Sequence, residues 1–493
     1  MKSFFALVLL ASSAAASVSL SSKAPPSHPV CIVGAGPAGL TAAHELQNLG
    51  YNTVVFEKRD TVGGKCQAYY DSRGQFHPLG ALLFTQESFR EVYPLIEESG
   101  LPRFPFAYDF KAWKYNWTTG IVAQSPFSFK DIYPQVENEV IKYTTFWMES
   151  FAPTMEAIGY PNGIPDELTV PFEQWLKGNG YGTIFREIIS HAMVPYGYGS
   201  ISETPTVYML QYFTPDVLLF FAGQRIGYVI DWHEVFVRFA NKNVHGPIYT
   251  GVSISAIDRS GVTPSVSYTT SDGVKGTQTC DKLVLAFPPL VDNLKAANLV
   301  VSTLESSVFG PVRTTEYWGG AVRVATPVGY GYSAETFEPN GRPSAFMRLF
   351  ANSDVATSWS WGTTGGGVTI DEAKRLLRET ISPFNKNPHD TSPPRVVTDA
   401  DIRGFSATDY FPRYEPAELR AGFYKKFGEL QGQQNTYYAS GFNGFETVEF
   451  AVRAGKDVVK SHFPQVQAEV EEIAVSSLVE QVSGHLAETL NLW

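Results

Sequence analysis

The sequence predicts a mixed α/β and α+β fold, in which a discontinuous Rossmann-like domain is interrupted by an inserted second domain. A short apolar run, a glycine-rich turn and a helical pattern follow one another at residues 30–49. Strand and helix patterns of the same kind return at 231–289 and again at 435–463. The segments between them differ, because 105–224 is aromatic and helix-like whereas 305–400 combines strand-like pieces with loops. One α/β domain is therefore predicted from three separated stretches of chain.

The composition excludes some classes of protein. Of the 493 residues, 44% are hydrophobic and 14% aromatic, which excludes a disordered or fibrous chain. Lys and Arg number 38 against 49 Asp and Glu, so the net charge is −11. A chain this acidic has no long-range attraction for phosphate backbones, and no nucleic acid partner is expected.

The first residues, "MKSFFALVLLASSAAAS", have the composition of a secretory signal peptide. One lysine precedes an apolar run from Phe4 to Ala11, and the small residues Ala14 and Ala16 follow. The pattern predicts cleavage of a signal peptide of residues 1–16. A spanning helix needs about 20 apolar residues, so no integral membrane segment is expected. We expect a protein that is secreted or held in the lumen of the secretory pathway.

Three cysteines are too few for a disulfide framework. Cys31 and Cys280 lie beside predicted strands and are interpreted as small core residues. Cys66 is interpreted as a buried, unreactive thiol rather than a redox centre, because no second cysteine lies beside it. The triplet Asn116-Trp117-Thr118 is an acceptor for N-glycosylation, which agrees with secretion.

The stretch "PVCIVGAGPAGLTAAHELQNLGYNTVVFE" reads as a strand, a helix and a second strand. "VCIV" is typical of a buried strand. Leu40, Ala43, Leu46 and Leu49 follow helical spacing, and Gly50 suits a helix C-terminal cap. "TVVFE" is the second strand, so the unit is βαβ and its sheet is expected to be parallel.

The turn inside this unit matches the dinucleotide fingerprint G-x-G-x-x-G. Gly34 allows the tight turn, Gly36 lets the backbone approach a pyrophosphate, and Gly39 lets the helix pack on the strand. The helix N-terminus offers free N–H groups to the phosphates. Glu57 follows at the expected spacing for a ribose contact and would repel a 2′-phosphate, which disfavours NADP. The predicted contacts of this unit are Gly34, Ala35, Gly36, Pro37, Ala38, Gly39, Glu57 and Lys58.

The stretch "EKRDTVGGK" after the second strand decides which dinucleotide is expected. It adds a second glycine turn, at Gly63 and Gly64, with Lys65 behind it. This order of elements resembles the FAD-dependent amine-oxidase and phytoene-desaturase superfamily, of the GR2/amine-oxidase type. The resemblance implies FAD as the cofactor. No second G-x-G-x-x-G stands between a strand and a helix, so no NADPH site is evident.

Later segments are similar to further elements of the same superfamily. "PLGALLF" resembles the segment in which Gly80 and Ala81 would approach the flavin. "SISAIDR" resembles the strand whose backbone meets the adenine, with Ile254 at that position, and "LAFPP" resembles the strand end beneath the isoalloxazine. Within the superfamily, the leader and the "TYYASG" ending look most like fungal flavoproteins of secondary metabolism.

The ending "YYASGFNGFETVEFAVRAGKDVV" resembles the closing motif of the superfamily. Gly441 would touch the pyrophosphate, and the helix start at Thr447 and Val448 would direct N–H groups at the flavin pyrimidine ring. Such N–H groups stabilise negative charge on a reduced flavin.

The chain departs from the amine oxidases on the catalytic side. The position of one flavin-flanking aromatic falls at Thr447, although Phe445 is close to it. No lysine lies between Lys295 and Lys374 to bind a water beside the flavin, and Arg313 and Arg323 are among the cations there. These departures make simple amine substrates doubtful and leave the catalytic residues unassigned.

A few other residues are candidates for either a functional or a structural role. His77 would be a proton carrier or covalent attachment point near the flavin, or a hydrogen-bonded structural histidine. His191 and the residues Tyr410, Phe411 and Arg413 of "DYFPR" would line a pocket or pack in the core. No cluster has convincing metal spacing, and no G-x-S-x-G motif indicates a hydrolase.

These patterns predict domain bounds and a function. The FAD-binding domain is expected at 28–105, 225–300 and 401–475, the substrate domain at 106–224 and 301–400, and a tail at 476–493. A cleft between the two domains would face the flavin.

The expected activity is that of an FAD-dependent oxidase or dehydrogenase, or an oxidative cyclase. It would take a hydride from a C–N or activated C–H bond of a small, largely apolar metabolite. The electrons would pass to O2 or another acceptor. The alternatives are a flavin-requiring isomerase or cyclase without net redox change, and a protein that binds flavin without chemistry.

Overall fold

The computed structural model describes residues 27–106, 111–125, 131–193, 195–335 and 340–466. The predicted signal peptide of 1–16 and the predicted tail of 476–493 lie outside the described residues.

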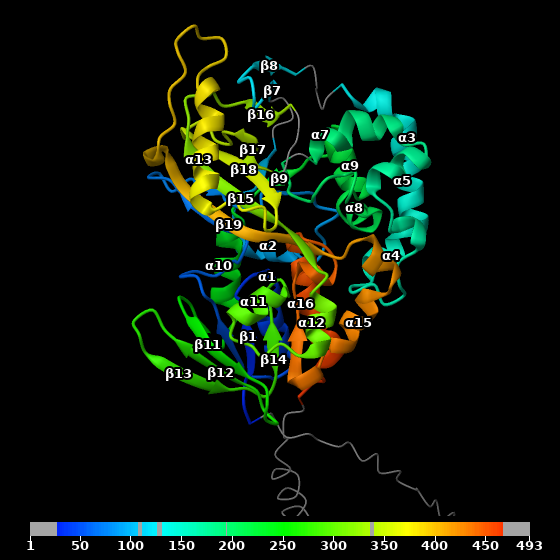
Figure 1. Cartoon of the computed structure of the whole chain (residues 1–493), viewed down its shortest axis with the longest axis vertical. Coiled ribbons are helices and arrows are strands. Elements are labelled where there is room, and N and C mark those ends of the chain that lie inside the picture. The colour runs from blue at the N-terminus through cyan, green and yellow to red at the C-terminus, as the bar shows by residue number, and fades with distance from the viewer. Residues whose placement is uncertain (1–26, 107–110, 126–130, 194, 336–339, 467–493) are drawn as a thin grey trace, which may run out of the picture. The chain divides into compact units, whose positions relative to one another are not determined.

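A five-stranded sheet is assembled from distant parts of the chain (Figure 1). All four neighbouring pairs are parallel. In spatial order the strands are β10 (Ile248–Tyr249), β2 (Thr53–Phe56), β1 (Val30–Val33), β14 (Leu283–Leu285) and β20 (Thr436–Tyr438). The central strands β1, β2 and β14 are buried at every residue, as expected of a parallel sheet that is covered on both faces.

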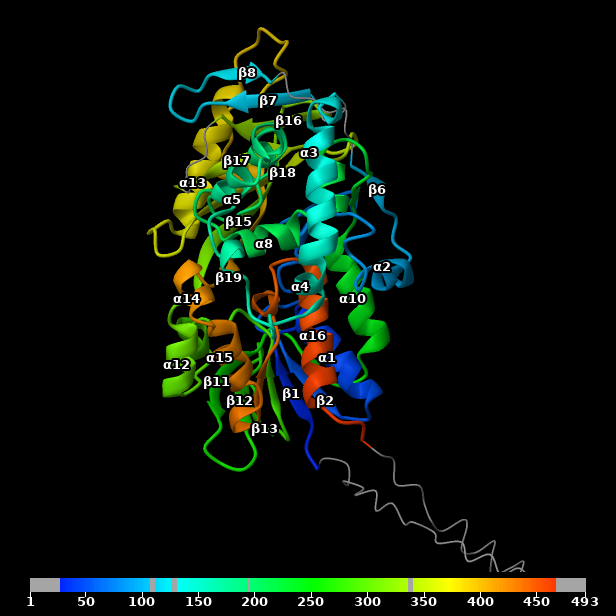
Figure 2. The same ribbon diagram turned by 90° about the vertical axis from the view of Figure 1, so that its right-hand side faces the viewer.

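The helices α1 (Pro37–Asn48) and α16 (Val448–His462) lie side by side in both views (Figures 1 and 2). They cross closely at Gly455, where a Cβ atom would lie 2.5 Å from the carbonyl oxygen of Ala38. The two ends of the described chain therefore form one α/β domain. The predicted βαβ unit and the predicted terminal strand contribute to the same sheet, and their helices pack together. A further helix, α10 (Trp232–Asn243), contacts α1.

One expectation about the cysteines is wrong. Cys31 and Cys280 are fully buried, as expected, but they form a disulfide bond with each other. The bond links β1 to the residues before β14 across 249 positions of sequence. The two cysteines meet because β1 and β14 are neighbours in the sheet, a relationship that neither local pattern reveals.

An antiparallel sheet of three strands follows β10 in the chain. It consists of β11 (Ser253–Asp258), β12 (Ser265–Thr269) and β13 (Lys275–Thr279). The last two strands are joined through the predicted turn at Asp272 and Gly273, where Gly273 has a φ of +87°.

The second large element is a sheet of seven strands. In spatial order these are β19 (Ile402–Arg413), β15 (Arg313–Arg323), β18 (Val355–Thr363), β17 (Asn340–Met347), β16 (Tyr330–Ala334), β7 (Lys111–Tyr115) and β8 (Val122–Gln124). Helix α13 (Ile370–Ile381) packs against it, over a core that includes Tyr115, Tyr332 and Phe384. The boundary predicted at residue 401 is displaced here, because β19 pairs with this sheet. The rest of the domain division stays a prediction.

A helical layer lies beside this sheet (Figure 1). Its helices are α3 (Tyr133–Phe146), α4 (Ala152–Glu156), α5 (Phe172–Gly178), α6 (Gly182–Ile184), α7 (Ser190–Ala192), α8 (Thr206–Tyr212) and α9 (Pro215–Phe221). Buried aromatic side chains, among them Tyr143, Trp147 and Phe213, fill the space between the helices. The aromatic composition of 105–224 therefore builds a hydrophobic core.

The short remaining elements connect the layers. The strands are β3 (Ala68–Tyr70) with β4 (Phe76–Pro78), and β5 (Leu83–Phe84), β9 (Tyr228–Val229) and β6 (Phe104–Pro105). The helices are α2 (Tyr93–Ser99), α11 (Val291–Ala296), α12 (Thr303–Phe309), α14 (Pro416–Arg420) and α15 (Phe423–Leu430). The seven-stranded sheet lies directly on the end of the β3–β4 hairpin, since a Cβ at Gly319 would be 2.1 Å from the Leu79 carbonyl oxygen.

Candidate functional site

The first glycine turn joins β1 to α1 in a geometry that excludes larger residues. Gly34 has a φ of +108°, and a Cβ there would lie 2.7 Å from the carbonyl oxygen of Ala286. A Cβ at Gly39 would lie 2.0 Å from the carbonyl oxygen of Gly34. Gly36 is the N-cap of α1, no side chain caps this helix, and its first turn holds no acidic residue. The N-terminus of α1 therefore offers uncapped N–H groups to an anion.

The second glycine turn packs against the first. The N–H of Gly63 donates to the carbonyl oxygen of Ala35 at 2.8 Å. Gly64 has a φ of +55°, and a Cβ there would lie 2.9 Å from the Cα of Gly36. The two turns thus form one continuous cradle of backbone.

Glu57 is held at the end of β2 directly beside this cradle. Its Oε2 accepts the N–H of Ala35 at 2.8 Å, and its Oε1 accepts the N–H of Arg59 at 2.9 Å. The side chain is buried, and each carboxylate oxygen keeps a second lone pair for a ribose hydroxyl. Lys58 is exposed beside it.

Lys65 connects the beginning of the chain to its end. Its Nζ lies 2.8 Å from Oε2 of Glu446. A Cβ at Gly80 would lie 1.9 Å from the carbonyl oxygen of Lys65, and the N–H of Ala81 donates to the same oxygen at 3.4 Å. A Cβ at Gly441 would lie 3.1 Å from the Cα of Glu446. Four of the predicted FAD contacts therefore lie at or beside this ion pair, namely Lys65, Gly80, Ala81 and Gly441.

The closing helix begins beside the same ion pair. Thr447 is the N-cap of α16, and its side chain accepts the N–H of Phe450. Val448 is the first helical residue and is buried. Thr447 therefore serves as a helix cap at the position where amine oxidases commonly carry an aromatic side chain.

Ile254, the predicted adenine contact, lies on β11 (Ser253–Asp258). Its carbonyl oxygen accepts the side-chain amide of Asn298 at 2.8 Å. Val252, two residues earlier, donates its N–H to the carbonyl oxygen of Glu57 at 3.1 Å. The chain after β10 (Ile248–Tyr249) therefore contacts the strand end that carries Glu57, and the adenine contact of Ile254 stays a prediction.

The residues present fit FAD. The cradle admits only glycine at its closest approaches, an uncapped helix N-terminus suits the pyrophosphate, and Glu57 suits a ribose. Lys65, Gly80, Ala81, Glu446 and Thr447 are each partly exposed although the elements around them are buried, which is expected of residues that line a ligand site. The individual contacts with FAD remain predictions.

A cluster of aromatic side chains begins beside Glu446. The Tyr198 hydroxyl donates to the Glu446 carbonyl oxygen at 3.1 Å. The Tyr198 ring stacks on Tyr410 at 5.5 Å between centroids, and Tyr410 stacks on Tyr317 at 4.8 Å. Phe445 lies 4.9 Å from Tyr198. We call Tyr198, Tyr317, Tyr410 and Phe445 the tyrosine wall.

The tyrosine wall is largely buried, and its phenols are neutral. Burial raises the pKa of the Tyr198, Tyr317 and Tyr410 phenols above its usual value, so they stay neutral at physiological pH. Lys65 Nζ lies 5.4 Å from the centroid of the Tyr410 ring. The sequence analysis named Tyr410 and Phe445 but missed Tyr198 and Tyr317. Tyr198 stands in the "YGYG" repeat, whose Gly197 (φ +72°) would place a Cβ 2.5 Å from the Tyr317 ring.

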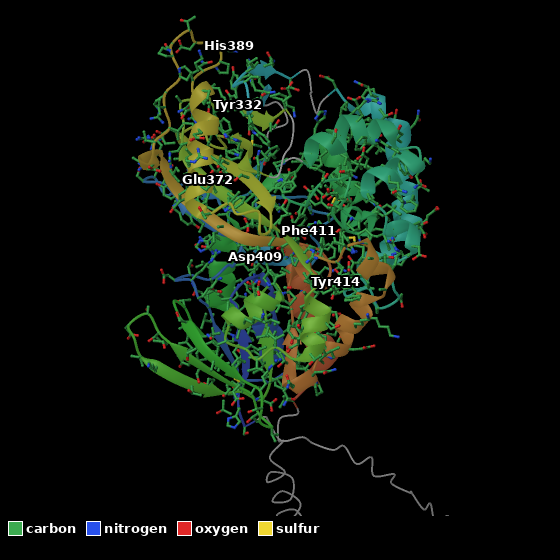
Figure 3. The ribbon with its side chains drawn as sticks, viewed as in Figure 1. Tyr332, Glu372, His389, Asp409, Phe411 and Tyr414 are labelled. Atoms are coloured by element: carbon green, nitrogen blue, oxygen red, sulfur yellow. A yellow bond between two sulfur atoms is a disulfide. The ribbon has the colours of Figure 1, made fainter. Side chains whose placement is uncertain are left out.

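The other "DYFPR" residues have structural roles. Phe411 is fully buried and packs between Tyr208 and Phe445, at 5.5 and 5.3 Å. Figure 3 shows it near Asp409 on β19, at the junction of the layers. Arg413 pairs with Glu415 at 3.1 Å.

His77 and Cys66 are both buried, as a structural role would require. His77 is fully buried, and its Nε2 lies 3.1 Å from Ser353 Oγ and 3.4 Å from Asp71 Oδ2. A hydrolytic triad would place serine and aspartate on opposite ring nitrogens, so this cluster is not one. Burial raises the pKa of the Cys66 thiol, which opposes thiolate chemistry.

The remaining candidates lie away from the tyrosine wall. His191 is exposed, and so is Arg313 at the start of β15. Arg323 pairs with Asp401 at 2.8 Å. Among the described residues there is no group of three metal-ligating side chains and no helix long and apolar enough to cross a membrane.

Comparison with known proteins agrees with this geometry. The family described as flavin containing amine oxidoreductase matches residues 37–313. The chain is 22% identical over 442 residues to the FAD-dependent oxidoreductase dpchF of Colletotrichum higginsianum, covering 83% of this chain and 87% of that protein. It is 24% identical over 449 residues to the beta-cyclopiazonate dehydrogenase of Aspergillus flavus, covering 84% and 88%.

A solved structure shows the same fold. The CLA-producing fatty acid isomerase from P. acnes aligns with a TM-score of 0.72 and 22% identity, over 89% of this chain and 99% of that one. The predicted fold class, superfamily and cofactor are thus confirmed. Because the family match spans more than half of the sequence, the chain belongs to the flavin containing amine oxidoreductases and is an FAD-dependent oxidoreductase.

Proposed function

We propose that this oxidoreductase removes a hydride from a C–N or activated C–H bond of a small, largely apolar metabolite. The observation that carries the proposal is the tyrosine wall beside Lys65 and Glu446. Its aromatic faces suit an apolar substrate, and its phenols stay neutral. Glu446, a carboxylate beside the wall, is paired with Lys65. The site thus favours positioning over strong general-base catalysis.

The chain's own residues would prepare the reaction in three ways. Bound FAD supplies an isoalloxazine ring that accepts a hydride. The glycine cradle and Glu57 hold the dinucleotide end. The tyrosine wall orients the substrate and excludes water, which strengthens every electrostatic interaction inside the site. The N-terminus of α16, capped by Thr447, places partial positive charge beside Glu446.

An anaerobic spectrum followed by exposure to air tests the proposal. The purified holoprotein is mixed with a panel of indole alkaloids, other amines and apolar metabolites, and the flavin absorbance is recorded. We expect bleaching with one class of compound and recovery on admitting O2, or on adding another acceptor if O2 reacts slowly. A flavin that no member of the panel reduces would contradict hydride removal from these classes. Product analysis then decides whether ring closure accompanies oxidation.

A flavin-requiring isomerase is the second candidate. It is favoured by the extent to which the chain's fold matches the fatty acid isomerase. An isomerase returns its flavin to the oxidised state without an external acceptor, so it turns over anaerobically with no lasting bleaching. A shifted double bond in recovered substrate, formed without O2, would support this candidate over the oxidase.

We also propose that the protein passes through the secretory pathway. The Cys31–Cys280 disulfide supports this, because such bonds persist in oxidising compartments. Asn116 also supports it, since this residue of the glycosylation triplet lies partly exposed between β7 and β8. Expression in a eukaryotic secretion host should yield a mature N-terminus near residue 17. Treatment with an N-glycosidase should lower the mass of the wild type but not of Asn116→Gln. Retention of the leader together with an unchanged mass would contradict secretion.

A further inference from the structure

A polar cavity of about 480 Å³ lies outside the flavin site. Its walls come from the β3–β4 hairpin, the loop between β17 and β18, and β19. Three arginines line it, Arg73 from the hairpin turn, Arg348 from the loop and Arg403 from the strand. The lining residues come from parts of the sequence that are far apart, so a local sequence motif could not predict the cavity.

Arg348 is firmly anchored, Arg73 and Arg403 are exposed, and none of the three guanidinium groups forms an ion pair in the described part of the chain. Among the described residues, none of them has a carboxylate oxygen within 4.0 Å. Arg348 is anchored by carbonyl oxygens instead, with Nε and Nη2 donating to Ser353 and Nη1 to Thr326 at 2.9 Å. Arg73 donates to the carbonyl oxygen of Asn352. Arg403 makes a long contact of 3.4 Å with Ala400. Two of the five N–H groups of Arg348 remain without a protein acceptor.

The two carboxylates of the cavity, Asp71 and Asp354, offset only part of the charge of the three arginines. The carboxylate of Asp71 accepts the backbone N–H groups of Arg73 and Gln75, at 2.9 and 3.0 Å. It also accepts the Ser353 hydroxyl at 2.8 Å. Oδ1 of Asp71 is therefore engaged by its own turn, and Oδ2 is engaged by Ser353 and His77. Asp354 is the other acid, and it lies beyond ion-pair distance of the three arginines. The lining thus keeps a positive excess in a chain whose net charge is −11.

The cost of burial falls on Arg348, because Arg73 and Arg403 are exposed. Arg348 is half-buried, and desolvation lowers the pKa of its guanidinium. Arginine presents planar, paired donors that match two oxygens of a carboxylate or a phosphate. From this cavity and its unpaired arginines, we propose a second ligand site, which binds an oxyanion such as a carboxylate or phosphate group of a small molecule. The site does not depend on the reaction proposed at the flavin.

Calorimetric titration of the holoprotein tests the proposal, with inorganic phosphate in one arm and acetate in the other. Ionic strength is kept constant with sodium chloride. We expect saturable binding of at least one of the two anions. The anion that binds more tightly shows whether the site prefers a phosphate or a carboxylate group. Arg348→Gln should weaken binding by about tenfold, since a charge-assisted hydrogen bond is lost. Arg403→Gln should weaken it less, and Asp354→Asn should strengthen it.

Arg313→Gln is the matched control, because Arg313 is an exposed arginine at the start of β15, outside the cavity. It should bind the anion as the wild type does. The flavin spectrum of each variant reports folding independently. If Arg348→Gln fails to fold, Arg403→Gln and Asp354→Asn decide the question with opposite expected signs. Equal affinities of all variants, or no saturable binding in either arm, would overturn the proposal.

Discussion

The Lys65 ammonium lies 2.8 Å from the Glu446 carboxylate, although the two residues are 381 positions apart. The pair joins the second glycine turn to the start of α16. With side chains 26% and 12% exposed, it is shielded more than an ordinary surface ion pair. It is therefore the contact through which both ends of the chain would act on one cofactor.

A double-mutant cycle on this pair should show coupling. Lys65→Gln and Glu446→Gln should each weaken FAD retention, and the double variant should lose less than the sum of the two. A coupling of about 1 kcal/mol is expected for a partly shielded pair. Equilibrium dialysis of FAD measures it. Lys177 and Glu173, an exposed pair on α5, provide the control cycle, in which FAD affinity should not change. Additive losses at Lys65 and Glu446 would show that the pair acts as two independent residues.

Gly64→Ala should reduce FAD binding strongly. The new Cβ would lie 2.9 Å from the Cα of Gly36, so the two glycine turns must separate. Gly74→Ala is the matched control, because Gly74 also has a positive φ (+75°) but has nothing within 4 Å of the added Cβ. Both variants lose about 1 kcal/mol or more of stability from backbone strain. The yield of flavin-bound protein should fall only for Gly64→Ala, and equal yields would place the cofactor elsewhere.

Glu57→Gln should lower the affinity for FAD by about tenfold, because a ribose hydroxyl loses a charged acceptor. The amide can replace one backbone contact, with Ala35 or with Arg59, but not both. Glu45→Gln on α1 removes the same charge outside the cradle and should leave binding unchanged. Fluorescence titration of the apoprotein with FAD measures both variants. Unchanged affinity in Glu57→Gln would remove the ribose role.

Glu305 gives the protein an acid-sensitive stability. It forms a buried pair with Arg259 at 2.7 Å, and Tyr438 donates its hydroxyl to the same carboxylate. Desolvation alone would raise the pKa of Glu305, but the Arg259, Tyr438 and Ser302 contacts outweigh it and lower the pKa to about 2. The folded value lies below the unfolded one. The stabilisation is therefore full above about pH 4.5 and is lost as the pH falls towards 2.

Glu305→Gln should remove that pH dependence. It should also destabilise the protein at pH 7 by about 3–5 kcal/mol, because Arg259 is left buried without a counter-charge. Thermal unfolding between pH 3 and 7 measures both effects. Glu372→Gln, in an exposed cluster with Arg375, is the control and should change stability little. A Glu305→Gln variant with the wild-type slope would mean that other carboxylates control acid unfolding.

The disulfide predicts a thiol count and a stability loss. Denatured protein should show one reactive thiol, from Cys66, and three after reduction. Replacing Cys31 and Cys280 together by alanine should cost about 2–5 kcal/mol, since the bond closes a long loop. Cys66→Ala should keep the bond. Three reactive thiols in unreduced protein would contradict the disulfide. They would also remove the support that the disulfide gives to the proposed secretion.

Local patterns were sufficient for elements that are continuous in sequence. The strand, glycine turn and helix around Gly34 follow from hydrophobic spacing, and Glu57 follows from its distance along the chain. Contacts set by strand order were not predictable, because nothing near Cys31 indicates that β14 becomes its neighbour. Tyr198 was missed for the same reason, since its role depends on Tyr410 of β19.

The parallel sheet takes its first strand from Val30–Val33 and its last from Thr436–Tyr438. During translation, the edge of β14 therefore stays unpaired until about the final tenth of the described chain leaves the ribosome. An unpaired strand edge promotes aggregation. The helix that completes the site, α16, is made later still. Capture of the flavin thus comes at the end of synthesis. A chain cut short by a nonsense codon before β20 would be colourless and a target for quality control, so yellow colour in a preparation reports full-length product.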